Sequence, residues 1–135
     1  MRIIEKAVET GAKQEMEVYA IEFRPDGILY LAAEDDFDAS DWSLPYIFSN
    51  EQFEVEVISN DLVGFKFVII ENIPMVVHHI LAEDLHLFHA IKDPDYVSFI
   101  RIENDNDIPD LMKSETYNPL EDFFNRLKKE PSLVL

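Results

Sequence analysis

Residues 15–33 carry the pattern that most constrains this chain, a period of two in the apolar side chains before a strong turn and a second, apolar segment after it. Met16, Val18 and Ala20 are interleaved with Glu17 and Tyr19, and residues 28–33 run back after Pro25-Asp26-Gly27. Successive side chains of a strand point to opposite faces, and turn residues of this kind favour a tight reversal. The pattern predicts a β-hairpin with strands at 15–24 and 28–33.

A second hairpin is predicted over residues 52–70. Phe53, Val55 and Val57 alternate with acidic residues, and Ser59-Asn60-Asp61 is a turn signal. Residues 62–70 are so rich in Phe, Val and Ile that we expect a central strand. Two other segments stay ambiguous. Residues 2–9 fit a short helix or a strand, and residues 34–50 fit a loop or a very short helix.

A helix is the favoured interpretation of residues 73–91. Its apolar residues recur with a helical period, Pro74 suits the first turn, and Lys92-Asp93-Pro94 ends the pattern. The alternative is a pair of strands that turns at Glu83-Asp84. Beyond this segment the pattern predicts a strand over 97–103 and a single helical turn near 108–113.

The clearest helix is predicted over residues 118–130. Asn118 is a good N-cap, Pro119 suits the first helical position, and Glu121 lies three residues after the cap. The apolar stripe consists of Leu120, Phe123, Phe124 and Leu127. The whole chain is therefore predicted to be one domain, residues 1–135, of the α+β class, with an antiparallel β-sheet built from two hairpins plus a further strand and helices packed on one face.

The charge balance limits the possible partners. The chain has 28 Asp and Glu residues against 11 Lys and Arg residues, a formal net charge of −17. Nucleic acids and anionic membranes are bound through basic patches, so neither is expected as a partner. Most of the excess lies between Pro25 and Met112, where a concentrated charge costs the fold self-repulsion. We therefore expect a basic protein or a cation as the partner.

Cysteine is absent from the 135 residues, which excludes disulfides, thiolate metal sites and a cysteine nucleophile. The apolar runs are far shorter than the ~20 residues of a membrane span. Glu5 and Glu9 interrupt the region where a signal peptide would be apolar. We expect the protein to reside in the cytoplasm.

A partner-binding surface is predicted in the acidic segment 34–46. Carboxylates there lie close to large aromatic residues, a combination that suits contact with a basic protein surface. The spacing of a calcium-binding loop is absent. The alternatives are a solvated loop and, for the single tryptophan, a place in the core. The predicted binding residues are Glu34, Asp35, Asp36, Phe37, Asp38, Asp41, Trp42 and Tyr46, with Glu54 and Glu56 from the following strand and Glu51 nearby.

Four histidines fall within twelve residues, at positions 78, 79, 86 and 89. On a helix, His79, Glu83 and His86 would share one face at spacings of i, i+4 and i+7, and these residue types can bind zinc or another transition metal. The alternative is that the histidines line the polar side of an amphipathic helix. We favour the alternative, and therefore expect no bound metal or other cofactor.

Signatures of the common enzyme classes are missing. The chain has only three glycines, so it has no glycine-rich loop that could bind phosphate, and no serine stands in a G-x-S-x-G turn. Carboxylate pairs occur often, as any chain this acidic must have them. We expect a binding protein and not an enzyme.

In size, acidity, lack of cysteine and hairpin-rich pattern, with a closing helix that starts Asn118-Pro-Leu-Glu-Asp-Phe-Phe, the chain resembles the small acidic immunity proteins of bacterial toxin systems, including those of contact-dependent growth inhibition. The resemblance implies a cytoplasmic protein without catalysis that binds and neutralises a cognate toxin domain, often a basic nuclease. Two other functions stay open. One is a small metal-binding protein or metal-dependent enzyme, and the other is an acidic inhibitor of the phage type that mimics DNA.

Overall fold

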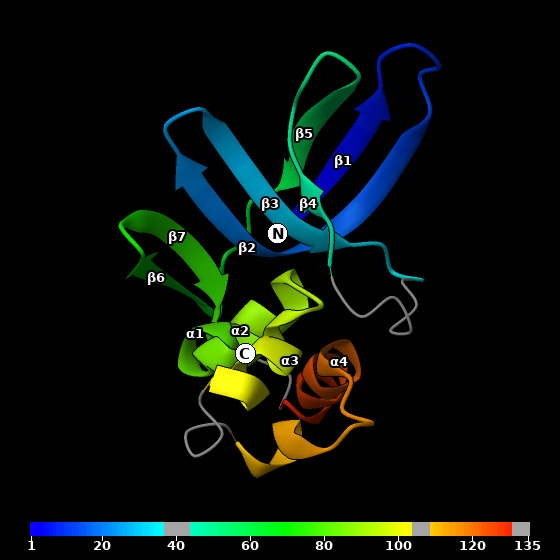
Figure 1. The fold of residues 1–135 in the computed structure, drawn as a ribbon. Coiled ribbons are helices and arrows are strands. Elements are labelled where there is room, and N and C mark those ends of the chain that lie inside the picture. Colours follow the sequence, from blue (N-terminus) through cyan, green and yellow to red (C-terminus); the bar gives the residue numbers. More distant parts are fainter. Residues whose placement is uncertain (37–43, 104–108, 131–135) are drawn as a thin grey trace.

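The computed structural model describes residues 1–36, 44–103 and 109–130, and it shows an antiparallel sheet of seven strands with helices on one side (Figure 1). The strands are β1 (Arg2–Ala7), β2 (Lys13–Arg24), β3 (Gly27–Ala33), β4 (Tyr46–Ile47), β5 (Phe53–Ser59), β6 (Phe65–Ile70) and β7 (Ile73–His78). The helices are α1 (His79–Glu83), α2 (Leu85–Lys92), α3 (Tyr96–Glu103), the 3-10 helix η2 (Asp110–Lys113) and α4 (Pro119–Lys129). The predicted α+β class is confirmed.

Strand β2 organises the sheet because it has neighbours along both of its edges. On one edge β1 pairs with its first half and β7 with its second half, while β3 pairs along the other edge. The register between β2 and β3 shifts between Val18 and Ala20. Such a bulge bends a strand and increases its twist. Beyond the bend the sheet separates into two arms, the β2–β3 hairpin and the β1–β5 pair (Figure 1).

The first predicted hairpin, residues 15–33, is confirmed as β2 and β3, and the strand alternative for residues 2–9 is confirmed as β1. The second hairpin, residues 52–70, is wrong in its pairing. Both segments are strands, but β5 pairs with β1 and β6 pairs with β7. Glu71 and Asn72 have positive φ angles of 53° and 67°, so they form a two-residue turn that joins β6 to β7 instead. Strand β6 consequently lies at an edge of the sheet and not at its centre.

The prediction of one helix over residues 73–91 is wrong in its first third. Residues 73–78 form strand β7, in which Met75 and Val77 point into the core, and helices follow only from His79. A short apolar run fits both periods, and pairing with β2 and β6 decided in favour of the strand. The strand predicted over 97–103 is also wrong, because helix α3 occupies 96–103. Its first turn follows Asp93, whose carbonyl accepts the N–H of Tyr96.

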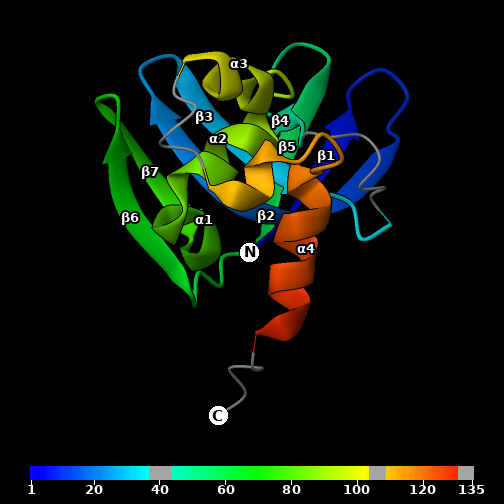
Figure 2. The same ribbon diagram turned by 60° about the horizontal axis from the view of Figure 1, so that its bottom comes forward.

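The predicted C-terminal helix is confirmed as α4, and the helical turn near 108–113 is confirmed as η2. The Asn118 side chain accepts the N–H groups of Leu120 and Glu121 at 3.0 and 3.3 Å, as an N-cap should. Figure 2 shows α4 and the other helices in front of the sheet. Phe123 and Leu120 of α4 are fully buried there.

Two apolar clusters hold the fold together. The larger one lies between the helices and the sheet and includes Leu31, Val77, Phe88 and Phe123. The smaller one lies on the helix-free face, where side chains of four strands, β1 to β4, meet: Ile3, Met16, Val18, Ile21, Ala32 and Ile47. The sheet is therefore covered by helices on one face and curls on itself at the other.

Candidate functional site

Arg2 on β1 ties the start of the predicted acidic segment to the sheet. Its Nε lies 2.7 Å from Glu15 Oε1, its Nη1 2.9 Å from Glu17 Oε2, and its Nη2 3.0 Å from Asp35 Oδ2. The hydrogen bonds to Glu15 and Asp35 raise the pKa of the guanidinium above its usual value. The Arg2 guanidinium thus forms ion pairs with three carboxylates, so Asp35 already has a partner within the chain.

The register of β1 assembles these carboxylates into one surface. Ile4 pairs with Glu15 on one side and with Glu56 on the other, and Lys6 pairs with Glu54. We call this surface the β1 acidic face and define it by Glu15, Glu17, Asp35, Glu54 and Glu56. The sequence analysis missed Glu15 and Glu17. Their alternation with buried Met16 and Val18 indicated that they point away from the core, but only the pairing with β1 places them on the same sheet face as Glu56, across β1.

The rest of the predicted segment divides into three parts. Glu34 and Asp36 share a hydrogen bond, which raises the pKa of Glu34. The predicted residues Phe37, Asp38, Asp41 and Trp42 lie outside the described residues. Tyr46 is half-buried on β4. Burial and a hydrogen bond to the Glu22 carboxylate raise the pKa of its hydroxyl, so Tyr46 has a structural partner within the chain.

Glu22 on β2 is a buried carboxylate that the sequence analysis did not single out, and only 1% of its surface is exposed. Its Oε1 lies 2.8 Å from Arg24 Nη2, and its Oε2 lies 3.7 Å from Lys92 Nζ. Burial pushes its pKa upward, but hydrogen bonds from Tyr46 and Arg24 and the charge of Lys92 outweigh burial and lower it. Its position two residues after buried Ala20, on the same strand face, was the signal in the sequence.

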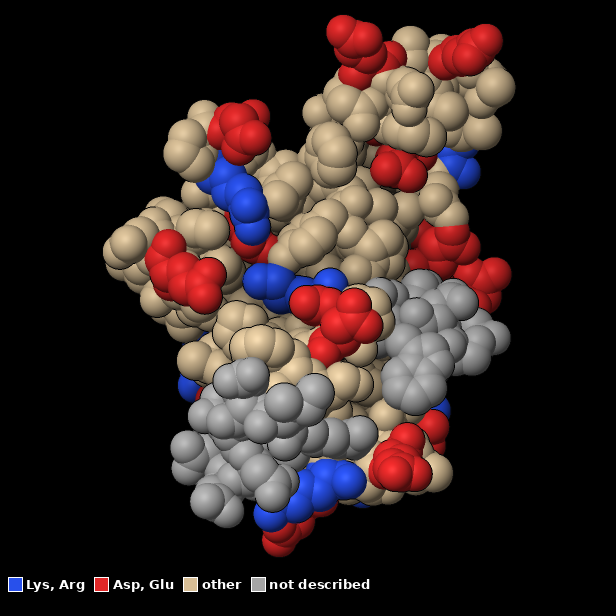
Figure 3. Space-filling model, viewed as in Figure 1, with Lys and Arg blue, Asp and Glu red and all other residues tan. Residues whose placement is uncertain are grey.

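A groove opens between the two arms of the sheet, and it encloses about 530 Å³. Figure 3 shows it as a notch whose floor consists largely of uncharged side chains. Ile28 and Phe48 line it with 44% of each side chain exposed, and Tyr30 and Val55 continue its apolar wall. Its one basic residue, Arg24, is already bonded to Glu22.

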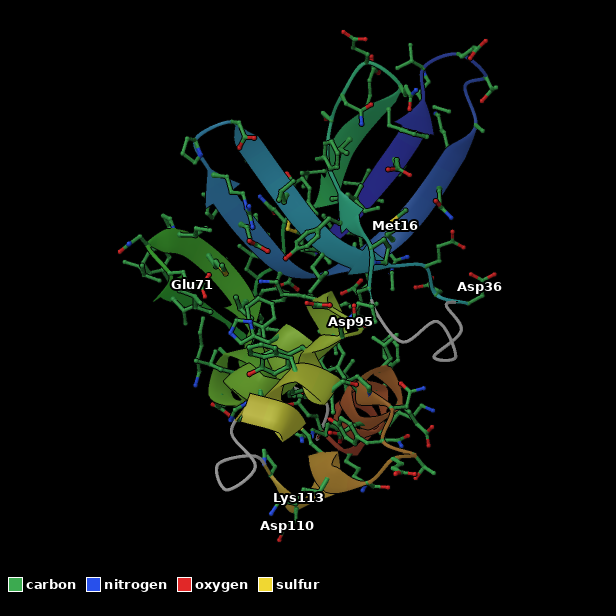
Figure 4. The ribbon with its side chains drawn as sticks, viewed as in Figure 1. Met16, Asp36, Glu71, Asp95, Asp110 and Lys113 are labelled. Atoms are coloured by element: carbon green, nitrogen blue, oxygen red, sulfur yellow. The ribbon has the colours of Figure 1, made fainter. Side chains whose placement is uncertain are left out.

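Acidic side chains exceed the cations available to them. Among the described residues, the α-amino group of Met1 and six Lys or Arg side chains form ion pairs with carboxylates: Arg2, Arg24, Lys66, Lys92, Lys113 and Arg126. The exposed carboxylates with no Lys or Arg within 4.0 Å in the described part of the chain include Glu9, Asp26, Glu51, Glu54, Glu56, Asp61, Glu71, Asp93, Asp95, Glu115 and Glu121. They are spread over separate elements, as Asp36, Glu71 and Asp95 illustrate (Figure 4).

The predicted arrangement of His79, Glu83 and His86 on one helical face does not form. Asp84, with φ −136°, separates α1 from α2. His79 Nδ1 lies 4.0 Å from Glu83 Oε2, and the Glu83 carboxylate also accepts a bond from Lys66. His86 Nδ1 lies 3.0 Å from the Tyr96 hydroxyl instead. The candidate metal ligands are thus divided between two helices.

The structure instead gathers His78, His79 and Glu130, with one nitrogen or oxygen of each within 4.8 Å of the others. His79 Nε2 pairs with Glu130 Oε1. His78 Nδ1 accepts the Ile80 N–H at 3.2 Å, so the neutral ring carries its proton on Nε2 and offers no lone pair there. The two rings are stacked, 4.6 Å apart at 28°, so their ring-plane lone pairs do not converge on one point. The cluster fastens the end of α4 to α1 and is poorly arranged for a metal.

Comparison with known proteins found no matching family model, no matching curated protein and no matching solved structure. Within the described residues, no helix is both long and apolar enough to cross a membrane.

Proposed function

We propose that this chain is a binding protein of the immunity type, which acts in the bacterial cytoplasm as a single domain and neutralises a basic toxin domain such as a nuclease. The observation that carries the proposal is the surplus of exposed carboxylates that remains after the cations of the described residues have formed their ion pairs. A surface of this kind attracts cationic proteins and speeds their association.

The groove supports the same proposal because it provides a place for the buried contacts that tight binding needs. Charge steers an encounter, but tight binding depends on large side chains that are buried at the centre of an interface. Ile28 and Phe48 are exposed in the groove, next to the acidic tips of the two arms (Figure 3). A basic partner with a protruding apolar residue could therefore bury that residue in the groove while its cations meet the rim.

The decisive experiment uses the toxin domain encoded by the open reading frame next to that of this chain. Association is followed by stopped-flow fluorescence at low and high salt. We expect a stable complex, loss of toxin activity in the complex, and slower association at high salt, because salt screens charges beyond about 8–10 Å.

Charge reversals test whether the start of the predicted acidic segment and the β1 acidic face make the contact. Asp36→Lys and Glu56→Lys are suitable because neither carboxylate is bonded to Arg2, whereas Asp35→Lys would also break an internal ion pair. Glu115→Lys is the matched control, since it makes the same charge change at an exposed site beyond η2. The two test variants should associate several-fold more slowly than the control.

Equal rates for all three variants would place the interface away from both Asp36 and the β1 acidic face. Absence of any complex with the neighbouring toxin domain would overturn the proposal. If the chain instead competed with DNA for a DNA-binding protein, it would belong to the DNA-mimic class.

A further inference from the structure

We propose that β6 is a self-association edge, through which two copies of this chain pair their β6 strands antiparallel into one continuous sheet. Strand β6 pairs with β7 on one side, and no described strand pairs with its other side. An edge of this kind presents backbone N–H and C=O groups that another strand can bind. The inference concerns assembly and does not depend on the proposed function.

The turn that joins β6 to β7 determines which backbone groups point outward. Because Glu71 and Asn72 both have positive φ, the turn is a two-residue type I′ turn, and Ile70 and Ile73 form its hydrogen-bonded pair. Hydrogen-bonded pairs alternate along an antiparallel ladder. Phe67 and Ile69 are therefore in non-hydrogen-bonded pairs with β7, and their N–H and C=O groups point to the open edge.

Two of the three exposed side chains on β6 are apolar. Phe67 and Ile69 are each 65% exposed, which is unusual for large apolar residues two positions apart on one strand. Native proteins usually protect an open edge with charged residues, proline or a bulge. Lys66, the charged residue of β6, is bonded to Glu83 of α1 and so faces the helices.

A second copy fits this edge in a self-complementary register. Pairing about Val68 places Phe67 of each copy opposite Ile69 of the other, so the outward groups of both residues form four backbone hydrogen bonds. The same register places Phe67 of each copy side by side with Ile69 of the other, so two cross-strand apolar pairs form. Phe65 lies outside this ladder because its N–H already bonds to the carbonyl of Leu62.

Charge also favours this place over the rest of the surface. The β6–β7 hairpin contains one lysine and one glutamate, Lys66 and Glu71, within a chain of net charge −17. Lys66 is already paired with Glu83, and the register about Val68 sets it opposite Ile70 of the other copy. The paired edge therefore carries little net charge, so the repulsion between the two acidic molecules is weak at this place.

The test is sedimentation equilibrium over a dilution series at two salt concentrations. We expect a dimer, at twice the 15.7 kDa of one chain, that becomes tighter as salt screens the overall repulsion. Phe67→Lys should weaken dimerisation at least about tenfold. Phe99→Lys is the control, because Phe99 of α3 is 59% exposed and the charge change is identical. Both variants lower the net negative charge, so increased repulsion cannot explain a loss of the dimer.

A second variant controls for the case in which Phe67→Lys fails to fold. Ile69→Pro removes one outward N–H but no bond to β7, and proline is tolerated at strand edges. It too should give a monomer with unchanged circular dichroism. A wild-type chain that is monomeric at every concentration, or a dimer that Phe67→Lys and Ile69→Pro leave intact, would overturn the proposal.

Discussion

Removing the Tyr46 hydroxyl should destabilise the protein measurably, because that hydroxyl donates a hydrogen bond to the buried Glu22 carboxylate. Glu22 is 1% exposed, so water cannot replace the lost donor. A hydrogen bond to a charged group contributes about 1.5–3 kcal/mol, and we expect Tyr46→Phe to lower the free energy of unfolding by about that amount. Urea denaturation at neutral pH measures it.

A double-mutant cycle separates the hydrogen bond from other effects of the substitution. Glu22→Gln removes the charge while keeping the shape, and the double variant Tyr46→Phe with Glu22→Gln completes the cycle. Residues in one network should show a coupling energy of roughly 0.5–3 kcal/mol. Strict additivity of the two single variants would refute the argument that the hydroxyl acts through the charge of Glu22.

The pH dependence gives an independent check of the same bond. The pKa of Glu22 is lowered in the folded protein from its ordinary value of 4.5. Its contribution to stability is therefore fully present above pH 4.5, and it is lost as the pH falls through the lowered pKa and the carboxylate becomes protonated. The difference in the free energy of unfolding between wild type and Tyr46→Phe should become smaller in that acidic range.

Three further outcomes are expected. Burial and the charge of His79 lower the pKa of His78 from 6.5 to about 4. The free energy of unfolding should therefore fall by about 3 kcal/mol between pH 6.5 and pH 4. His78→Asn, which keeps a capping oxygen, should remove this pH dependence in urea titrations at several pH values. Phe123→Ala should cost about 3–5 kcal/mol, because Phe123 is fully buried, and thermal unfolding would show it. Zinc titration by calorimetry should show no stoichiometric binding, and one bound zinc per chain lost on His79→Ala would contradict the tautomer argument for His78.

Local patterns were sufficient for several elements. The hairpin at 15–33 follows from the alternation that begins at Glu15 and from the turn signal Pro25-Asp26-Gly27, and α4 follows from its cap at Asn118 and one apolar stripe. Both depend on interactions between residues close in the sequence, which is why a sequence alone can reveal them. The net charge, and with it the expectation of a basic partner, also comes directly from composition.

Pairing between distant segments was decided only by the tertiary structure. Residues 53–59 and 65–70 look like one hairpin, yet β1 binds the first segment and the turn at Glu71-Asn72 gives the second segment to β7. The same long-range pairing made residues 73–78 a strand, although their sequence pattern had predicted a helix. It also placed Glu15 and Glu56 on one sheet face, across β1, and buried Glu22 against Lys92. Periodicity records which face of a segment is apolar, but the choice of neighbour depends on burial and ladder hydrogen bonds summed over the whole sheet.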